Sequence, residues 1–171
     1  MKQQESMHMG TNCSRCGKKT TNKDLFIIDE QQVCVHCLYG TAQPFALYPI
    51  GIVKNELTRA QKGFGTTGKK DISRIELFES QKPFLYKLDD EKHITVVYYL
   101  HQSESVKSVF KRGLDGKKVG VFASRTPYRL SKIGIQDVRL IQIEGTTLYV
   151  DGLDAINNTP VLDIKMSWNQ T

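Results

Sequence analysis

The chain has 171 residues, of which 39% are hydrophobic and 25% charged, and its formal net charge is +6. This composition is typical of a folded globular protein and excludes the fibrous and intrinsically disordered classes. No apolar run approaches the about 18 residues of a membrane span, and the N-terminus has no signal-peptide core, so we expect a cytoplasmic protein with no membrane partner. The positive charge favours a polyanionic partner, although a soluble basic protein without one is an open alternative.

All four cysteines of the chain lie in two C-x-x-C pairs near the N-terminus. The pairs are Cys13 with Cys16 and Cys34 with Cys37, and this spacing is typical of a tetrahedral zinc site. The apolar run 25–28 between them predicts a strand, so we interpret the region as a zinc-ribbon-like module. Its metal would be structural, because four protein ligands leave no open position.

Three alternatives accompany the zinc interpretation. Two disulfides would require an exported protein, and nothing in the sequence suggests export. A redox dithiol is disfavoured because the two pairs together use every cysteine. His36, between two of the expected ligands, could replace one of them.

A connector follows the cysteine pairs. Residues 38–45 contain Gly40 and Pro44, which interrupt regular structure. We therefore predict a domain boundary near residue 45, with a tail and zinc module in residues 1–45 and a second domain in residues 46–171.

The second domain is predicted to be mostly β. Short β-rich runs follow one another at 47–54, 72–78, 84–88, 94–100, 118–124, 135–143, 146–150 and 161–164. The dipeptides at 115–116 and 144–145 predict tight turns, and the run 94–100 is apolar on both faces, which indicates a central strand. We expect a small antiparallel β-barrel, which leaves no exposed edge, with one helix near 105–112.

Residues 63–70 (GFGTTGKK) nearly match a phosphate-binding loop. The final position is lysine, which lacks the hydroxyl that binds magnesium, and the next residues alternate with the period of a strand. We therefore do not expect nucleotide hydrolysis. A basic loop beside a nucleic acid, or a solvated hairpin tip, fits better.

Two stretches look suited to ligand binding. The apolar run at 120–127 (GVFASRTP) predicts a strand ended by Pro127, which would present Arg125 at the end of a rigid element. Residues 154–165 alternate Asp, Asn and Thr with apolar residues, as expected for a turn that presents hydrogen-bonding groups.

These stretches also carry a resemblance. Together with YPIGIVKN at 48–55, YYLHQ at 98–102 and TPVLDIK at 159–165, they resemble the TsaA-like family of S-adenosylmethionine-dependent tRNA methyltransferases. The resemblance implies a β-barrel that binds the methyl donor and N6-methylation of threonylcarbamoyl-adenosine beside the anticodon. It also implies a homodimer.

The resemblance further implies which residues contact the methyl donor. These are Asn55, Glu56, Leu57, His101, Gln102, Arg125, Ile135, Asp154, Ala155, Ile156 and Asn157. Arg125 could pair with the donor carboxylate or with a tRNA phosphate. No catalytic residue is identified, although a general-base role for His101 would suit its titration range.

One loop departs from the family pattern. Where the family reads RPNPIG, residues 129–134 read RLSKIG, so both prolines are absent. Two alternatives follow, namely a zinc-ribbon RNA-binding protein with a catalytically altered barrel, and a methyltransferase of another substrate.

Overall fold

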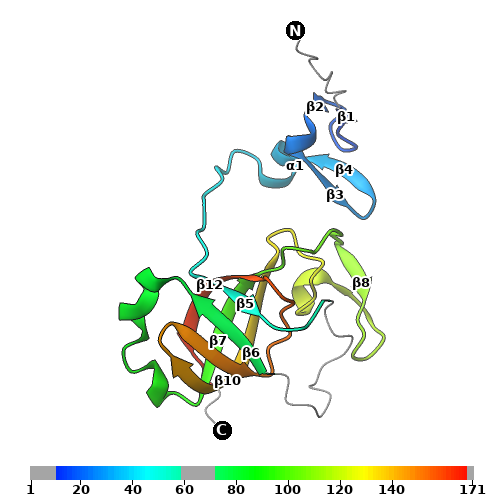
Figure 1. Ribbon diagram of the computed structural model, residues 1–171. Coiled ribbons are helices and arrows are strands. Elements are labelled where there is room, and N and C mark those ends of the chain that lie inside the picture. The colour runs from blue at the N-terminus through cyan, green and yellow to red at the C-terminus, as the bar shows by residue number, and fades with distance from the viewer. Residues whose placement is uncertain (1–10, 59–71, 169–171) are drawn as a thin grey trace, which may run out of the picture.

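The structure is a computed structural model that describes residues 11–58 and 72–168. A small N-terminal unit stands beside a barrel, and residues 40–50 connect the two (Figure 1). The N-terminal unit contains β1 (Thr11–Asn12), β2 (Lys19–Thr20), η1 (Asn22–Asp24), β3 (Leu25–Ile28), β4 (Gln31–Cys34) and α1 (Val35–Tyr39). The strand predicted at 25–28 is therefore confirmed.

The larger part is a closed antiparallel barrel, which confirms the predicted fold class. Its strands are neighbours in the order β10-β11-β6-β5-β12-β7. Their bounds are β5 (Gly51–Lys54), β6 (Ile72–Leu77), β7 (His93–Tyr99), β10 (Ile133–Glu144), β11 (Thr147–Asp151) and β12 (Pro160–Met166). As predicted, β7 is central, because it pairs with both β10 and β12.

The barrel encloses an apolar core. Alternate residues of β6 and β11 point inward, so Ile75, Leu148 and Val150 are fully buried, and β7 adds Ile94 and Val96. Register shifts in β10 and β12 mark bulges, which bend strands and help a sheet to close. The β10–β11 hairpin turns at Gly145 with φ of 62°, as the dipeptide at 144–145 predicted.

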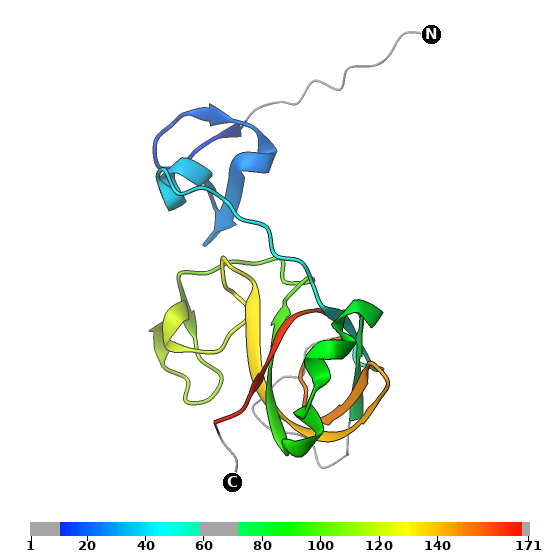
Figure 2. The same ribbon diagram turned by 90° about the vertical axis from the view of Figure 1, so that its left-hand side faces the viewer.

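Between β7 and β10 the chain leaves the barrel for residues 101–132, which we call the excursion. It contains β8 (Val109–Lys111), β9 (Lys118–Gly120) and η4 (Val121–Ala123), and it lies beside the barrel below the N-terminal unit in Figures 1 and 2. The turn at 115–116 is confirmed, with Gly116 at φ of 69°. The helix predicted at 105–112 is wrong, because this segment forms β8 and pairs with β9.

Two further strand predictions need correction. Residues 84–88 are not a strand: η2 (Glu79–Leu85) contains Pro83, η3 (Leu88–Asp90) follows, and Lys87 between them has φ of 61°. Phe84 and Tyr86 are 78% and 82% exposed, so their alternation does not reflect burial. The strand predicted at 118–124 ends at Gly120.

The phosphate-loop-like residues 63–70 lie outside the described residues. Within the described ranges, no helix is both long and apolar enough to cross a membrane.

Candidate functional site

One end of the barrel gathers most of the predicted site residues. β5, β7 and β11 end there and β10 and β12 begin there, as the pairing of Ile133 with Tyr99 and of Pro160 with Ile52 shows. We call this end the rim, which comprises residues 54–57, 98–101, 133–136 and 152–160.

Asn55 joins two strand ends at the rim. Its Nδ2 donates to Ala155 O at 2.7 Å and to Ser73 Oγ at 2.9 Å. Its Oδ1 accepts from the Leu57 N–H at 3.1 Å, and its own N–H donates to Asn157 Oδ1 at 3.2 Å. The structure thus brings these predicted residues together. Because the amide of Asn55 is engaged within the protein, its role is to fix the loop.

The loop after β11 is held by Gln136, which the sequence analysis missed. Gln136 Nε2 donates to Gly152 O at 2.5 Å, and its Oε1 accepts from Asp154 N at 2.9 Å. Leu153 and Ala155 are buried at 3% and 2% exposure, so the exposed Asp154 between them points outward. One amide therefore fixes the carboxylate of Asp154 at the rim. A glutamine inside an otherwise apolar strand was the available signal.

Tyr98 is a second residue that sequence reasoning missed. Its ring lies on Gly134, where an added Cβ would stand 2.5 Å from Tyr98 Cε2, so only glycine fits there. Burial and the nearby charge of Asp154 raise the pKa of Tyr98 to about 12, while the charge of Arg125 partly opposes this. Tyr98 therefore stays neutral at physiological pH, and its hydroxyl lies in the combined field of Asp154 and Arg125.

His101 lies where β7 turns away from the barrel. Its N–H donates to Tyr99 O at 2.8 Å, and its Nδ1 is 3.4 Å from Oγ1 of the buried Thr159. The ring is thereby placed at the start of β12. The other predicted residues are less enclosed: Glu56, Gln102 and Ile135 are exposed, and Ile156 is half-buried.

Arg125 lies in the excursion, in an irregular segment. The prediction that it ends a strand is wrong, because β9 stops at Gly120 and η4 intervenes. The segment is nevertheless held, since the Arg129 guanidinium donates to Ser124 O and the neighbouring Thr126 is buried. Arg125 itself is exposed.

The four cysteines of the N-terminal unit form one cluster. Their sulfur atoms all lie within 4.8 Å of one another, and the Cys13–Cys37 and Cys16–Cys34 sulfur pairs are both 3.9 Å apart. A tetrahedron of thiolates around zinc, with bonds of about 2.3 Å, has S···S edges of about 3.8 Å. A disulfide bond would be about 2 Å long, and all four cysteines are free. The cluster could therefore hold one metal ion.

Backbone groups favour the thiolate form in this cluster. The N–H groups of Cys34 and Arg15 donate to Cys13 Sγ at 3.3 Å and 3.4 Å. They lower the pKa of the Cys13 thiol to about 6, with the Cys34 contribution the largest. A lowered thiol pKa suits a metal ligand, because the thiolate is the binding form.

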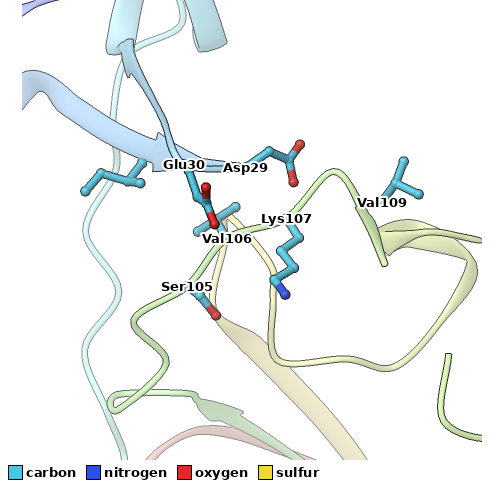
Figure 3. Close-up of a pocket in the computed structure, with 7 residues that line it drawn as sticks. Asp29, Glu30, Ser105, Val106, Lys107 and Val109 are labelled. Carbon is cyan, nitrogen blue, oxygen red and sulfur yellow. The ribbon is translucent and has the colours of Figure 1, made fainter. Parts of the chain in front are cut away.

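The N-terminal unit contacts the excursion through the β3–β4 turn (Figure 3). Asp29 N donates to Val106 O at 3.1 Å, and Ser108 donates both its N–H and its hydroxyl to the Asp29 carboxylate. These bonds lower the pKa of Asp29. Beside them lies a cavity of about 380 Å³ lined by residues of both parts, including Glu30 and Lys107.

The loop that lacks the family prolines lies at the same junction. Leu130 packs against the apolar cluster of the N-terminal unit, as does Val106. Lys132 has φ of 52°, and its carbonyl accepts from Leu100 N at 2.7 Å. The loop is therefore fixed by contacts on both sides.

Known proteins resemble this chain over the barrel. An S-adenosyl-L-methionine-binding protein of Archaeoglobus fulgidus is 31% identical over 121 residues, which cover 70% of this chain and 86% of that protein. A probable S-adenosyl-L-methionine-binding protein of Methanothermobacter thermautotrophicus is 36% identical over 119 residues, or 68% of this chain and 85% of that protein.

Longer proteins match over a smaller share of their length. The human tRNA (adenine(37)-N6)-methyltransferase is 34% identical over 95 residues, which cover 54% of this chain and 22% of that enzyme. A crystal structure of TrmO from Pseudomonas aeruginosa superposes with a TM-score of 0.56 at 25% identity, covering 73% of this chain and 56% of that one. This chain thus spans only part of either protein.

The match of a family model agrees with the fold and with the geometry of the rim. Residues 59–171 match the tRNA-methyltransferase O N-terminal domain. The chain therefore belongs to the family of tRNA-methyltransferase O N-terminal domains.

Proposed function

We propose that this chain is an S-adenosylmethionine-dependent methyltransferase that acts on tRNA, at N6 of threonylcarbamoyl-adenosine beside the anticodon. Family membership is the observation that carries the proposal. Relatives named for S-adenosyl-L-methionine binding and for tRNA adenine methylation support it. The net charge of +6 suits an RNA substrate.

We further propose that the rim binds the methyl donor. The carboxylate of Asp154 suits the ribose hydroxyls or the cationic end of the donor, and the guanidinium of Arg125 suits its carboxylate. His101 and Gln102, residues 55–57, Ile135 and residues 155–157 complete the proposed set. Among these, Asn55 and Asn157 act by fixing the loop, because their side chains bond within the protein.

The bound donor would supply an electrophilic methyl group, and the chain would hold and orient both reactants. The fit rests on a rim whose polar groups are already fixed before binding. Gln136 holds the backbone of Asp154. Tyr98, packed on Gly134 and neutral at physiological pH, offers an apolar wall with one hydroxyl.

Calorimetry with S-adenosylmethionine tests the donor site. The wild type is expected to bind, and Gly134→Ala is expected to weaken binding at least tenfold because the new methyl group displaces the Tyr98 ring. Gly113→Ala is the matched control, since a Cβ there meets nothing within 4 Å. Equal affinity in all three proteins would reject the rim as the donor site.

Nucleoside mass spectrometry tests the substrate. Cells that lack the protein are expected to lose the N6-methylated form of threonylcarbamoyl-adenosine from tRNA. If the donor binds but this nucleoside persists, the enzyme methylates another substrate. If the wild type does not bind the donor, the alternative of an RNA-binding protein with an altered barrel is favoured.

We propose that the cysteine cluster binds zinc with a structural role, with the N-terminal tail and zinc module in residues 1–45 and the methyltransferase domain in residues 46–171. Sulfur separations of 3.9 Å support the metal. We also propose a cytoplasmic homodimer. Tyr99 and Ile133, which face each other across β7 and β10, are each 37% exposed and offer an apolar contact surface. Light scattering after size-exclusion chromatography tests the dimer.

A further inference from the structure

A basic hollow of about 430 Å³ lies on the excursion, away from the cysteine cluster. Three arginines line it, namely Arg112, Arg125 and Arg129, together with Phe122 and Leu114. Phe122 is 85% exposed and Leu114 is 68% exposed. An aromatic ring so fully exposed beside three cations contributes little to folding, which leaves ligand binding as its use.

Two of the arginines form the frame of the hollow. Arg112 pairs with Asp115, with Nε 2.9 Å from Oδ1, and its Nη1 donates to Ala123 O at 3.2 Å. Arg129 donates to Ser124 O and, at 3.4 Å, to Val121 O. These bonds hold the backbone of residues 121–124 from one side, and Val121 is buried. Phe122 and Arg125 therefore remain available at the surface.

The hollow adjoins the rim. The charge of Arg125 acts on the hydroxyl of Tyr98, whose ring packs on Gly134. A ligand in the hollow would accordingly lie next to the proposed donor site. Such a position suits a part of the substrate that is close to the methylated atom.

We propose that this hollow binds one nucleotide of single-stranded RNA, with its base stacked on Phe122 and its phosphate paired with Arg125. A guanidinium matches two phosphate oxygens, and an aromatic ring accepts the face of any base. RNA is favoured over an acidic peptide because every nucleotide supplies both a phosphate and a flat π face. The inference rests on the proposed function, since it describes how the RNA substrate is held.

Binding of a fluorescent anticodon stem–loop RNA to the full chain tests the base contact. Phe122→Ala is expected to weaken binding about tenfold, and Phe122→Trp to restore it. The heat of S-adenosylmethionine binding and the melting temperature should stay unchanged. Phe84→Ala is the matched control, because Phe84 is 78% exposed in η2, on the opposite side of the barrel from β8 in Figure 1.

Salt dependence tests the phosphate contact. Arg125→Gln is expected to reduce the slope of log K against log salt by about 0.7, the value for one phosphate of a single strand, whereas Phe122→Ala should leave the slope unchanged. If Arg125→Gln alters donor binding but not this slope, the phosphate contact is rejected.

The outcomes separate this inference from the proposed function. If the wild type binds RNA and methylates it but Phe122→Ala binds equally well, the nucleotide site is wrong and the function stands. If methylation is absent but Phe122→Ala still weakens RNA binding, the function fails and the site stands. A wild type that binds no RNA overturns both.

Discussion

The barrel and the N-terminal unit are stabilised in different ways. The barrel core consists of apolar side chains such as Ile75, Leu148 and Val161, each completely buried. The core of the N-terminal unit consists of Cys13, Ile28, Val33 and Cys34, so half of it is potential metal ligand. Val106 and Leu130 of the excursion complete that core from outside. The barrel can therefore fold by burial alone, whereas the N-terminal unit needs a metal and a neighbour.

This difference assigns the two regions different tasks. The barrel supplies a rigid rim whose loops are fixed by Asn55 and Gln136. The N-terminal unit lies away from the rim but contacts the excursion that carries Arg125, through Asp29 and Leu130. It can therefore influence the site by holding the excursion in place.

Removing one metal ligand should have the largest effect and be confined to one region. Cys13→Ser is expected to abolish metal binding and to unfold the N-terminal unit, because metal binding and folding are coupled in small sites of this kind. Metal analysis should fall from about one zinc per chain to almost none. Hydrogen exchange should rise throughout residues 11–39 while β7 and β10 stay protected.

His36→Asn is the matched control for the cysteine variant. His36 is exposed and lies outside the sulfur cluster, so metal content should not change. If His36→Asn loses the metal and Cys13→Ser keeps it, the assignment of the ligands is wrong. If Cys13→Ser also unfolds the barrel, the two regions are not independent.

A cavity in the barrel should have the converse effect. Ile75→Ala removes a fully buried side chain and should lower the free energy of unfolding by about 2–5 kcal/mol in urea titrations. The metal content should stay the same. Ile141→Ala, at a residue of β10 that is 39% exposed, should change stability by less than about 0.5 kcal/mol. Equal losses in both variants would contradict the core described here.

The smallest effect is expected at the contact between the regions. Asp29→Ala removes the acceptor of the Ser108 N–H, so exchange of that amide should quicken while metal content and barrel stability are retained. The KM for tRNA should rise more than kcat falls, because the excursion loses one of its anchors. Glu30→Ala, at the neighbouring turn position, is the control.

The same contact should respond to acid. Because Ser108 lowers the folded-state pKa of Asp29, the stabilising effect of its carboxylate is complete above the ordinary pKa of about 4 and is lost as the pH falls through the lowered value. Protection of the Ser108 amide should follow this titration. Asp29→Asn should show no such dependence, and an unchanged titration in that variant would exclude Asp29 as its cause.

Much of the fold could be predicted because its signals are local. Alternating burial in β6 and β11 and turns at Gly116 and Gly145 depend on neighbouring residues. The cysteine spacing likewise predicted the cluster. The strand predicted at 84–88 failed because apolar residues can alternate in an exposed segment, and only the φ of Lys87 shows the break.

The excursion and the rim were harder to predict because their contacts join distant parts of the chain. Residues 105–112 have local helical character, but pairing with β9 and the contact with Asp29 override it. Gln136 and Tyr98 act through Gly152 and Gly134, which lie far from them in sequence. A periodicity within one element gives no information on such partners.

The backbone at Lys132 bears on how this protein can be re-engineered. A proline fixes φ near −65°, so the second proline of the family loop could not occupy a position at φ of 52°. The first would remove the leucine that packs into the N-terminal unit. Loop and appendage are thus matched to each other, and a chimaera that exchanges either one alone should fold poorly at their seam, whereas exchange of both together should be tolerated.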